Sequence, residues 1–143
     1  MQWLIDNDVK DKGEYQLTNA MENMKRKGAR FKAGAVDVWM DCGNKNAMVD
    51  TNTKVLGFLQ GDKGLVSASL KSVNSVVIPP CFIGDGVELV NSVVGPNVSI
   101  ETGTHITDST IRNTIIGRDA VIATSSLDGA MLGNRGKVTG LRG

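Results

Sequence analysis

The chain contains one histidine, His105, and this side chain is the best suited to acid–base chemistry. A histidine titrates near neutral pH, so it can act as a general base towards a hydroxyl or an amine. Glu88 stands seventeen residues earlier, at the same position of a repeat described below. A solvated His–Glu pair on a polar surface would explain both residues without catalysis. Both interpretations stay open at this point.

Other reactive groups give weaker signals. Cys42 and Cys81 lie in different segments without the spacing of metal ligands, so we expect neither a zinc site nor a disulfide framework. The basic cluster between Lys25 and Lys32 is typical of a solvated helix end, with phosphate binding as the alternative. With a net charge of +1, 4% aromatic residues, no long apolar run and no signal-peptide order, the chain is predicted to be cytoplasmic, without nucleic-acid or membrane partners.

From Val77 to Val138 a large aliphatic residue recurs every five or six positions, and every third one falls in the same column. The columns are Val77, Val94, Ile111 and Leu127; Ile83, Ile100, Ile116 and Leu132; and Leu89, Ile106, Ile122 and Val138. Two positions before each is a compact residue: Ser75, Ser92, Ser109 and Ser125; Cys81, Val98, Thr114 and Ala130; and Val87, Thr104, Ala120 and Gly136. This period fits neither a helix nor hairpins, and it predicts three short parallel strands per coil around a narrow core.

Four segments within these coils resemble a known repeat. Ile83–Glu88, Val94–Ser99, Ile100–His105 and Ile116–Val121 are similar to the hexapeptide repeat of left-handed parallel β-helices. The resemblance implies the left hand, because general topology rules favour right-handed crossovers. The predicted fold class is therefore mainly β: a left-handed parallel β-helix over residues 65–143, preceded by a partial α/β segment over residues 1–64.

The first 64 residues follow a different pattern. Leu17, Met21 and Met24 recur at helical spacing, which predicts a helix with Thr18 as its N-cap and Gly28 just past its end. Alternating apolar residues predict a strand over 36–40, and a second helix is expected after residue 43, ending before the glycine-rich residues 61–64. One strand leaves both of its edges unpaired, so this segment is only part of an α/β layer.

Two motifs in this segment resemble sugar-1-phosphate nucleotidyltransferases, of the glucose-1-phosphate thymidylyl- or uridylyltransferase kind. Gly13–Ala20 is similar to the family's Gly-Glu-x-x-Leu-Thr-Asp-Ala stretch, with Asn19 in place of the usual Asp. Trp39–Gly43 is similar to its Trp-Leu-Asp-Thr/Cys-Gly motif. Their order ahead of hexapeptide repeats also matches the longer members. The resemblance implies that the chain is the C-terminal part of such an enzyme.

The resemblance also implies roles for two carboxylates. Asp41 matches a residue that helps to hold the catalytic Mg²⁺, a hard ion that takes carboxylate and phosphate oxygens. Capping of the following helix is the alternative role for Asp41. Glu14 matches a residue of the family's Gly-Glu pair, which implies a substrate-binding role, with a purely structural role as the alternative. The family's Gly-x-Gly-x-Arg nucleotide loop is absent from this sequence. We therefore expect an assembly or regulatory portion that is inactive alone and needs no cofactor.

Two further expectations concern an alternative function and partners. The hexapeptide family also includes acyltransferases that use acetyl-coenzyme A with a histidine as general base, and His105 would take that role here.

The residue before each column member points outward, and two of the resulting ladders carry apolar residues: Val76, Val93, Thr110 and Ser126 in the first, and Phe82, Ser99, Ile115 and Met131 in the second. Exposed apolar ladders favour a homo-oligomer, a dimer or trimer. The apolar surface of the partial α/β segment would suit the rest of the catalytic domain.

Overall fold

The computed structural model describes residues 1–141, in two compact units: Met1–Trp39, and a second unit that begins at Met40. Three helices and thirteen strands lie in the described residues. They are α1 (Gln2–Asp6), α2 (Leu17–Arg26), α3 (Lys45–Phe58), β1 (Lys71–Val73), β2 (Val76–Val77), β3 (Cys81–Ile83), β4 (Glu88–Val90), β5 (Val93–Val94), β6 (Val98–Ile100), β7 (His105–Thr107), β8 (Thr110–Arg112), β9 (Ile115–Ile116), β10 (Val121–Ala123), β11 (Ser126–Asp128), β12 (Met131–Leu132) and β13 (Lys137–Thr139).

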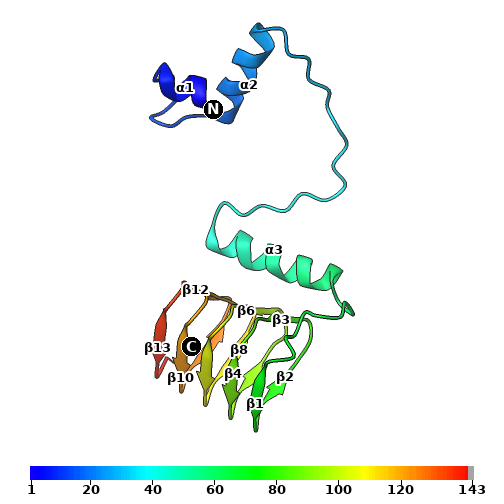
Figure 1. Ribbon diagram of the computed structural model, residues 1–143, viewed down its shortest axis with the longest axis vertical. Helices are drawn as coiled ribbons and strands as arrows, with labels where there is room; N and C mark the ends of the chain where they lie inside the picture. The colour runs from blue at the N-terminus through cyan, green and yellow to red at the C-terminus, as the bar shows by residue number, and fades with distance from the viewer. Residues whose placement is uncertain (142–143) are drawn as a thin grey trace. The chain divides into compact units, whose positions relative to one another are not determined.

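The strands form a parallel β-solenoid, as the column pattern predicted. They group into three sheets with the orders β1-β4-β7-β10-β13, β11-β8-β5-β2 and β12-β9-β6-β3. Each strand therefore pairs with the strand three places along the chain, and the pairings are parallel. Figure 1 shows the coils stacked along the axis of the solenoid. The mainly β fold class is confirmed over residues 71–139.

The predicted columns form the core. Ile106 is the Cα partner of Leu89 on one side and of Ile122 on the other, so each column stacks in register. The side chains of Ile100, Ile106 and Ile111 have no exposed surface. Column members at the two ends of the solenoid, such as Val77 and Val138, are only partly buried because no further described coil covers them.

Buried serines occupy one row of compact positions, and a hydrogen-bond ladder explains why they are tolerated there. The Ser92 hydroxyl donates to the Val90 carbonyl at 2.7 Å and accepts the Ser109 N–H at 3.1 Å. The same arrangement recurs one coil later, where the Ser109 hydroxyl accepts the Ser125 N–H at 3.1 Å. Each hydroxyl thus donates one hydrogen bond and accepts another from a backbone N–H. Its burial therefore leaves no polar group without a partner, which removes the penalty for burying it.

The first unit consists of α1 and α2, whose buried residues are Leu4 and Ala20. Helix α2 ends as predicted, with Gly28 just beyond it at a φ of 91°. The predicted cap at Thr18 is wrong. The helix begins at Leu17 with Gln16 in the N-cap position, and Gln16 makes no side-chain capping bond.

The predicted strand over residues 36–40 is absent, and the partial α/β layer is not confirmed. Residues 29–42 contain no helix or strand. Val36 and Val38 do alternate with polar residues, but their side chains are 69% and 52% exposed. A strand needs a neighbour to take up its backbone hydrogen bonds, and none of the described strands pairs with this segment.

Helix α3 forms where the second helix was predicted. Asn44 caps its start, because its Oδ1 accepts the Ala47 N–H at 3.0 Å. The helix buries Val49 and Leu56 and lies along the β12-β9-β6-β3 face of the solenoid (Figure 1). Helix α3 therefore belongs to the second unit. The division into a nucleotidyltransferase-like segment, residues 1–64, and a β-helix, residues 65–143, stays a prediction.

The position of α3 changes the interpretation of the second outward ladder. The predicted exposure of Phe82 and Ile115 is wrong, since both are only partly exposed on the face that α3 covers. Ser99 is held directly, because its hydroxyl donates to Asn52 Oδ1 at 2.6 Å. Met131, in the last coil of this face, stays 39% exposed.

Candidate functional site

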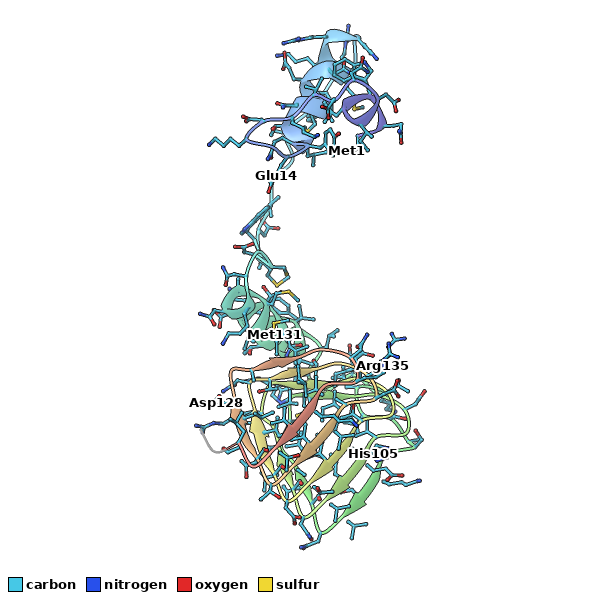
Figure 2. All side chains as sticks on the ribbon, turned by 90° about the vertical axis from the view of Figure 1, so that its left-hand side faces the viewer. Met1, Glu14, His105, Asp128, Met131 and Arg135 are labelled. Carbon is cyan, nitrogen blue, oxygen red and sulfur yellow. The ribbon has the colours of Figure 1, made fainter. Side chains whose placement is uncertain are left out.

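The structure brings His105 and Glu88 together, as the repeat predicted. They are Cα partners on adjacent strands β7 and β4, so their side chains project from the same outer face. The His105 Nδ1 lies 3.1 Å from Glu88 Oε2. Lys71, one strand further on β1, places Nζ 2.7 Å from Glu88 Oε1. The result is a Lys–Glu–His row across three strands; Figure 2 shows His105 on the surface of the solenoid.

The charges of this row favour an ionised Glu88. The hydrogen bond and charge of Lys71 lower the pKa of Glu88, with His105 contributing less, and Glu88 in turn raises the pKa of Lys71. A carboxylate with a lowered pKa adds stability above its unfolded-state pKa and loses it as the pH falls through its folded value. The side chains of Lys71 and His105 are 72% and 51% exposed, so solvent screens the row and its contribution is small.

Chemically, the row supplies an oriented imidazole. The contact with Glu88 engages Nδ1 and leaves Nε2 for proton transfer, the arrangement used by a carboxylate-oriented base. A catalytic base also needs a pocket that holds its substrate. The cavities described below are lined by other residues, and His105 lies on an open sheet face. The geometry therefore fits a solvated surface pair more closely than a catalytic centre.

Glu14 and Asp41, the two carboxylates suggested by the family resemblance, lie in different units. Glu14 is exposed at the turn before α2, and its Oε2 accepts a hydrogen bond from Gln16 Nε2 at 3.3 Å. Asp41 is exposed before α3, where its Oδ1 accepts the Gly43 N–H at 2.9 Å. The Asp41 carbonyl accepts the Thr51 hydroxyl at 2.8 Å, which ties this turn to the helix.

The residues present do not make up a magnesium site by themselves. Within residues 1–141, no group of three or more His, Cys, Asp or Glu side chains is placed to hold a metal ion. Asp41 would supply one carboxylate, with one of its oxygens already engaged by Gly43, and a bound Mg²⁺ needs further oxygen ligands. The ligand role of Asp41 therefore stays a prediction.

Both cysteines are free, and burial raises the pKa of the Cys81 thiol.

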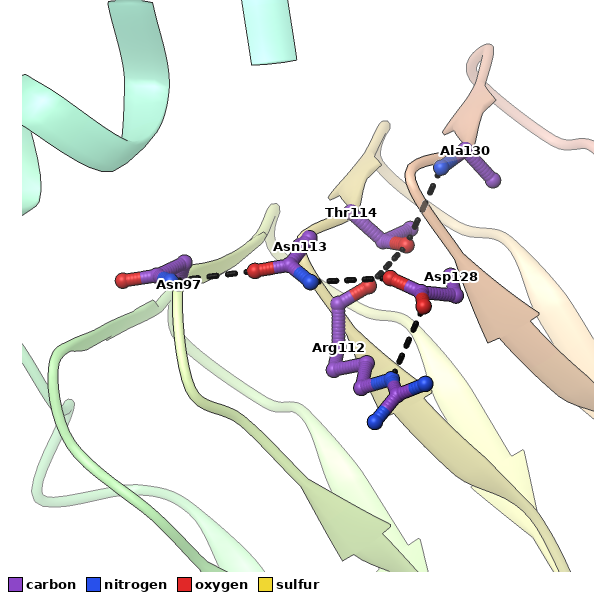
Figure 3. Close-up of polar contacts among 6 residues, drawn as sticks. All are labelled: Asn97, Arg112, Asn113, Thr114, Asp128 and Ala130. Carbon is purple, nitrogen blue, oxygen red and sulfur yellow. Dashed lines mark hydrogen bonds and ion pairs between the residues drawn. The ribbon is translucent and has the colours of Figure 1, made fainter. Parts of the chain in front are cut away.

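A ladder of polar side chains lies along one corner of the solenoid, and it was not predicted from the sequence. Asn97 Nδ2 donates to Asn113 Oδ1 at 3.0 Å, and Asn113 Nδ2 donates to Asp128 Oδ1 at 2.8 Å (Figure 3). Arg112 Nε donates to the other Asp128 oxygen at 2.9 Å. The hydrogen bond from Asn113 is the main reason that the pKa of Asp128 is lowered. The recurrence of Asn at one-coil spacing was the available sequence signal.

The second unit contains two hollows, and one of them borders the corner ladder. A polar one of about 350 Å³ lies between α3 and the corner ladder, lined by Asp50, Thr53, Asn113 and Asp128 among others. Because Asn113 and Arg112 occupy both oxygens of Asp128, that carboxylate acts as a brace for the corner. An apolar one of about 270 Å³ lies beside the first coil, with Val77 and Cys81 in its wall.

The fold defines the chain as a parallel β-solenoid protein, consistent with hexapeptide repeats. The chain matches no known protein family, and no curated protein is significantly similar to it. The relation to nucleotidyltransferases therefore rests on the two sequence motifs and on their order ahead of the solenoid. Among the described residues, no helix has the length and apolar character needed to cross a membrane.

Proposed function

We propose that the chain is the C-terminal assembly and regulatory portion of a sugar-1-phosphate nucleotidyltransferase, with a left-handed solenoid. One observation carries this proposal: the order of its parts. Helix α2 begins at Leu17, inside the first motif, and the turn at Asp41, inside the second, leads directly into α3. The parallel solenoid follows. In this proposal the missing catalytic portion would supply the nucleotide loop, and Asp41 would add one ligand to its Mg²⁺.

Sequencing of the genomic DNA upstream of the Met1 codon tests this parentage. We expect an open reading frame that continues upstream and encodes a Gly-x-Gly-x-Arg loop, because phosphoryl transfer needs positioned phosphates. An upstream stop codon, with no separate gene for such a loop nearby, would contradict the parentage. The solenoid fold itself would be unaffected by that result.

The assembly role rests on the first outward ladder. Val76 and Val93 pair on adjacent strands and are 55% and 37% exposed, on a face that α3 does not cover. A flat apolar face of this kind is best covered by the same face of another copy, since a closed dimer or trimer leaves no apolar edge. We propose a homo-oligomer through this face.

Replacing Val76 and Val93 with Lys should lower the particle mass measured by light scattering at micromolar concentration. Two ammonium groups would have to be desolvated without partners at the centre of the interface. The matched control is Val121→Lys, a 39% exposed residue on a different face, which should leave the mass unchanged. A wild-type chain that is monomeric, or equal effects of the two changes, would remove this face as the interface.

One observation favours a second candidate function, acyl transfer from acetyl-coenzyme A. The contact of His105 Nδ1 with Glu88 presents an oriented imidazole, as a general base requires. An acetylation assay of the wild-type chain with amino sugars and sugar phosphates decides between the candidates. We expect no turnover for the assembly portion. Turnover that disappears in His105→Ala but persists in Lys137→Ala, on the same ladder, would favour the acyltransferase.

A further inference from the structure

The polar hollow of about 350 Å³ beside α3 has two walls, and both present polar side chains. One wall is α3, where Asn46, Asp50 and Thr53 recur at spacings of four and three residues and so lie on one side of the helix. The other wall is the corner of the solenoid, with Asn113 and Asp128 of the corner ladder (Figure 3). The volume lies at the lower end of the range for ligand pockets, so the hollow has room for one small molecule.

Hydrogen bonds fix the two walls relative to each other. At the start of α3, Lys45 Nζ donates to the Gly129 carbonyl at 3.0 Å, next to Asp128. Further along the helix, the Ser99 hydroxyl donates to Asn52 Oδ1 at 2.6 Å. Because α3 is held to the solenoid at both places, the hollow is formed before a ligand arrives. Binding therefore requires little ordering of the walls.

The helix wall carries side chains that are free to bind a ligand. Thr51 and Asn52 have hydrogen-bond partners, but within residues 1–141 no hydrogen bond or ion pair engages the side chains of Asn46, Asp50 or Thr53. An amide donates and accepts, a carboxylate accepts, and a hydroxyl does both. This wall thus offers donors as well as acceptors.

The solenoid wall also keeps unused hydrogen-bonding capacity. Each oxygen of Asp128 accepts one hydrogen bond, from Asn113 or from Arg112, although a carboxylate oxygen has two lone pairs. Asn113 Nδ2 uses one of its two N–H groups in the bond to Asp128. The ladder therefore holds both side chains in place and leaves an acceptor and a donor beside the hollow.

The charges around the hollow favour an uncharged ligand. Asp50 and Asp128 are negative, while Arg112 pairs with Asp128 at 2.9 Å. Lys45 adds a second positive charge at the Gly129 edge. A phosphate group would face two carboxylates, and an ammonium group would leave the amide donors unused because it only donates. A hydroxyl group both donates and accepts, so it matches the mixed lining.

We propose that this hollow binds an uncharged sugar, with hydroxyl groups held between Asp50 on α3 and Asn113 and Asp128 on the solenoid. Val49, which is 7% exposed and lines the same hollow, offers an apolar surface to the C–H groups of a sugar ring. The inference goes beyond the proposed function, because the site lies outside both sequence motifs and outside the first ladder.

NMR titration of the ¹⁵N-labelled full chain with D-glucose, D-galactose and D-mannose tests the ligand class. We expect at least one of them to give saturable shifts of the side-chain amide signals of Asn46 and Asn113, because hydroxyl groups would replace water there. The 1-phosphate of that sugar should bind at least tenfold more weakly, since the two carboxylates repel it. No saturable shift with any of the three, a 1-phosphate that binds as tightly, or tighter binding of the diamine putrescine would overturn the proposal.

Asp50→Ala tests the location of the site. The change removes a carboxylate acceptor and should raise the dissociation constant of the sugar at least tenfold, while α3 stays folded because alanine favours helices. Asp62→Ala is the matched control: it removes an exposed carboxylate beyond the end of α3 and should leave the dissociation constant unchanged. Far-UV circular dichroism checks the helix in both variants. Equal affinities of Asp50→Ala and the wild-type chain, or equal losses in the two variants, would overturn the assignment.

Discussion

Replacing Ile100 with Asp is expected to unfold the solenoid cooperatively. The Ile100 side chain has no exposed surface and stacks between Ile83 and Ile116 in one column. A carboxylate at this position would lie in an apolar core without a hydrogen-bond donor, and burying an unpaired charge is among the most destabilising single changes. We expect a loss of more than about 4 kcal/mol in the free energy of unfolding. Circular dichroism with urea titration measures it.

Val121→Asp is the matched control for Ile100→Asp. Val121 lies on β10 in the middle of its sheet, but its side chain points outward and is 39% exposed, on a face separate from the proposed interface. The same carboxylate would stay in water there, so the change should cost less than about 1 kcal/mol. Val121 is a cleaner control than Ser99, whose hydroxyl bonds Asn52 of α3. Equal losses at positions 100 and 121 would show that the inward and outward positions are assigned wrongly.

Gly95→Ala is expected to be the second most damaging change. Gly95 has a φ of 107°, and an added Cβ would collide with the Ile78 carbonyl oxygen of the previous coil. The Cys81 Sγ would lie only 2.9 Å away. The obstacle is the Ile78 backbone, whose N–H donates to the Val94 carbonyl at 2.7 Å, so it cannot move aside easily. We expect a loss of about 3 kcal/mol or more, from overpacking together with an unfavourable left-handed conformation. Urea midpoints measure this loss.

Gly129→Ala separates the two causes of the Gly95→Ala effect. Gly129 also has a positive φ, 64°, but an added Cβ would meet no atom within 4 Å. Its replacement should therefore cost only the conformational part, about 1–2 kcal/mol. If Gly95→Ala were no worse than Gly129→Ala, the close approach of the coils at Ile78 would be contradicted.

The solenoid was predictable because its period is carried by many residues at once. A column position accepts only a large aliphatic residue, and the position two before it accepts only a compact one, so each coil repeats the same constraint. The Ser92 and Ser109 ladder shows how polar residues meet that constraint through local hydrogen bonds. The first strand, β1 at Lys71–Val73, was not predicted because its coil lacks the hexapeptide signature.

Contacts between distant segments were not predictable from local pattern. Nothing in the helical spacing of residues 45–58 indicates that Asn52 will bond Ser99 and cover the second ladder. The strand expected over residues 36–40 fails for a related reason: alternation describes a surface, while a strand also needs a partner. Helix α3 has a tertiary contact with the solenoid, whereas residues 36–40 have no strand to pair with. That difference decided whether the second ladder is covered and whether the expected strand forms.

The candidate site likewise combines a contact that was predicted from the repeat with one that was not. Glu88 and His105 share a ladder in the repeat, so their contact followed from the predicted register. Lys71 joined them only in the structure, because β1 lies outside the predicted columns. The roles of Glu14 and Asp41 came from the resemblance to a family, and they stay predictions. A carboxylate acquires such a role from neighbours that this sequence does not contain.

Pyrophosphate release in a split-enzyme assay tests the central claim most directly. The chain is mixed, with Mg²⁺, a nucleoside triphosphate and a sugar 1-phosphate, with the upstream portion that carries the nucleotide loop. We expect no release from the chain alone, release from the mixture, and at least a tenfold reduction with Asp41→Asn, while Asp62→Asn, at an exposed carboxylate beyond α3, has little effect. Release by the chain alone that Asp41→Asn abolishes, or a mixture no more active than the upstream portion by itself, would contradict the claim.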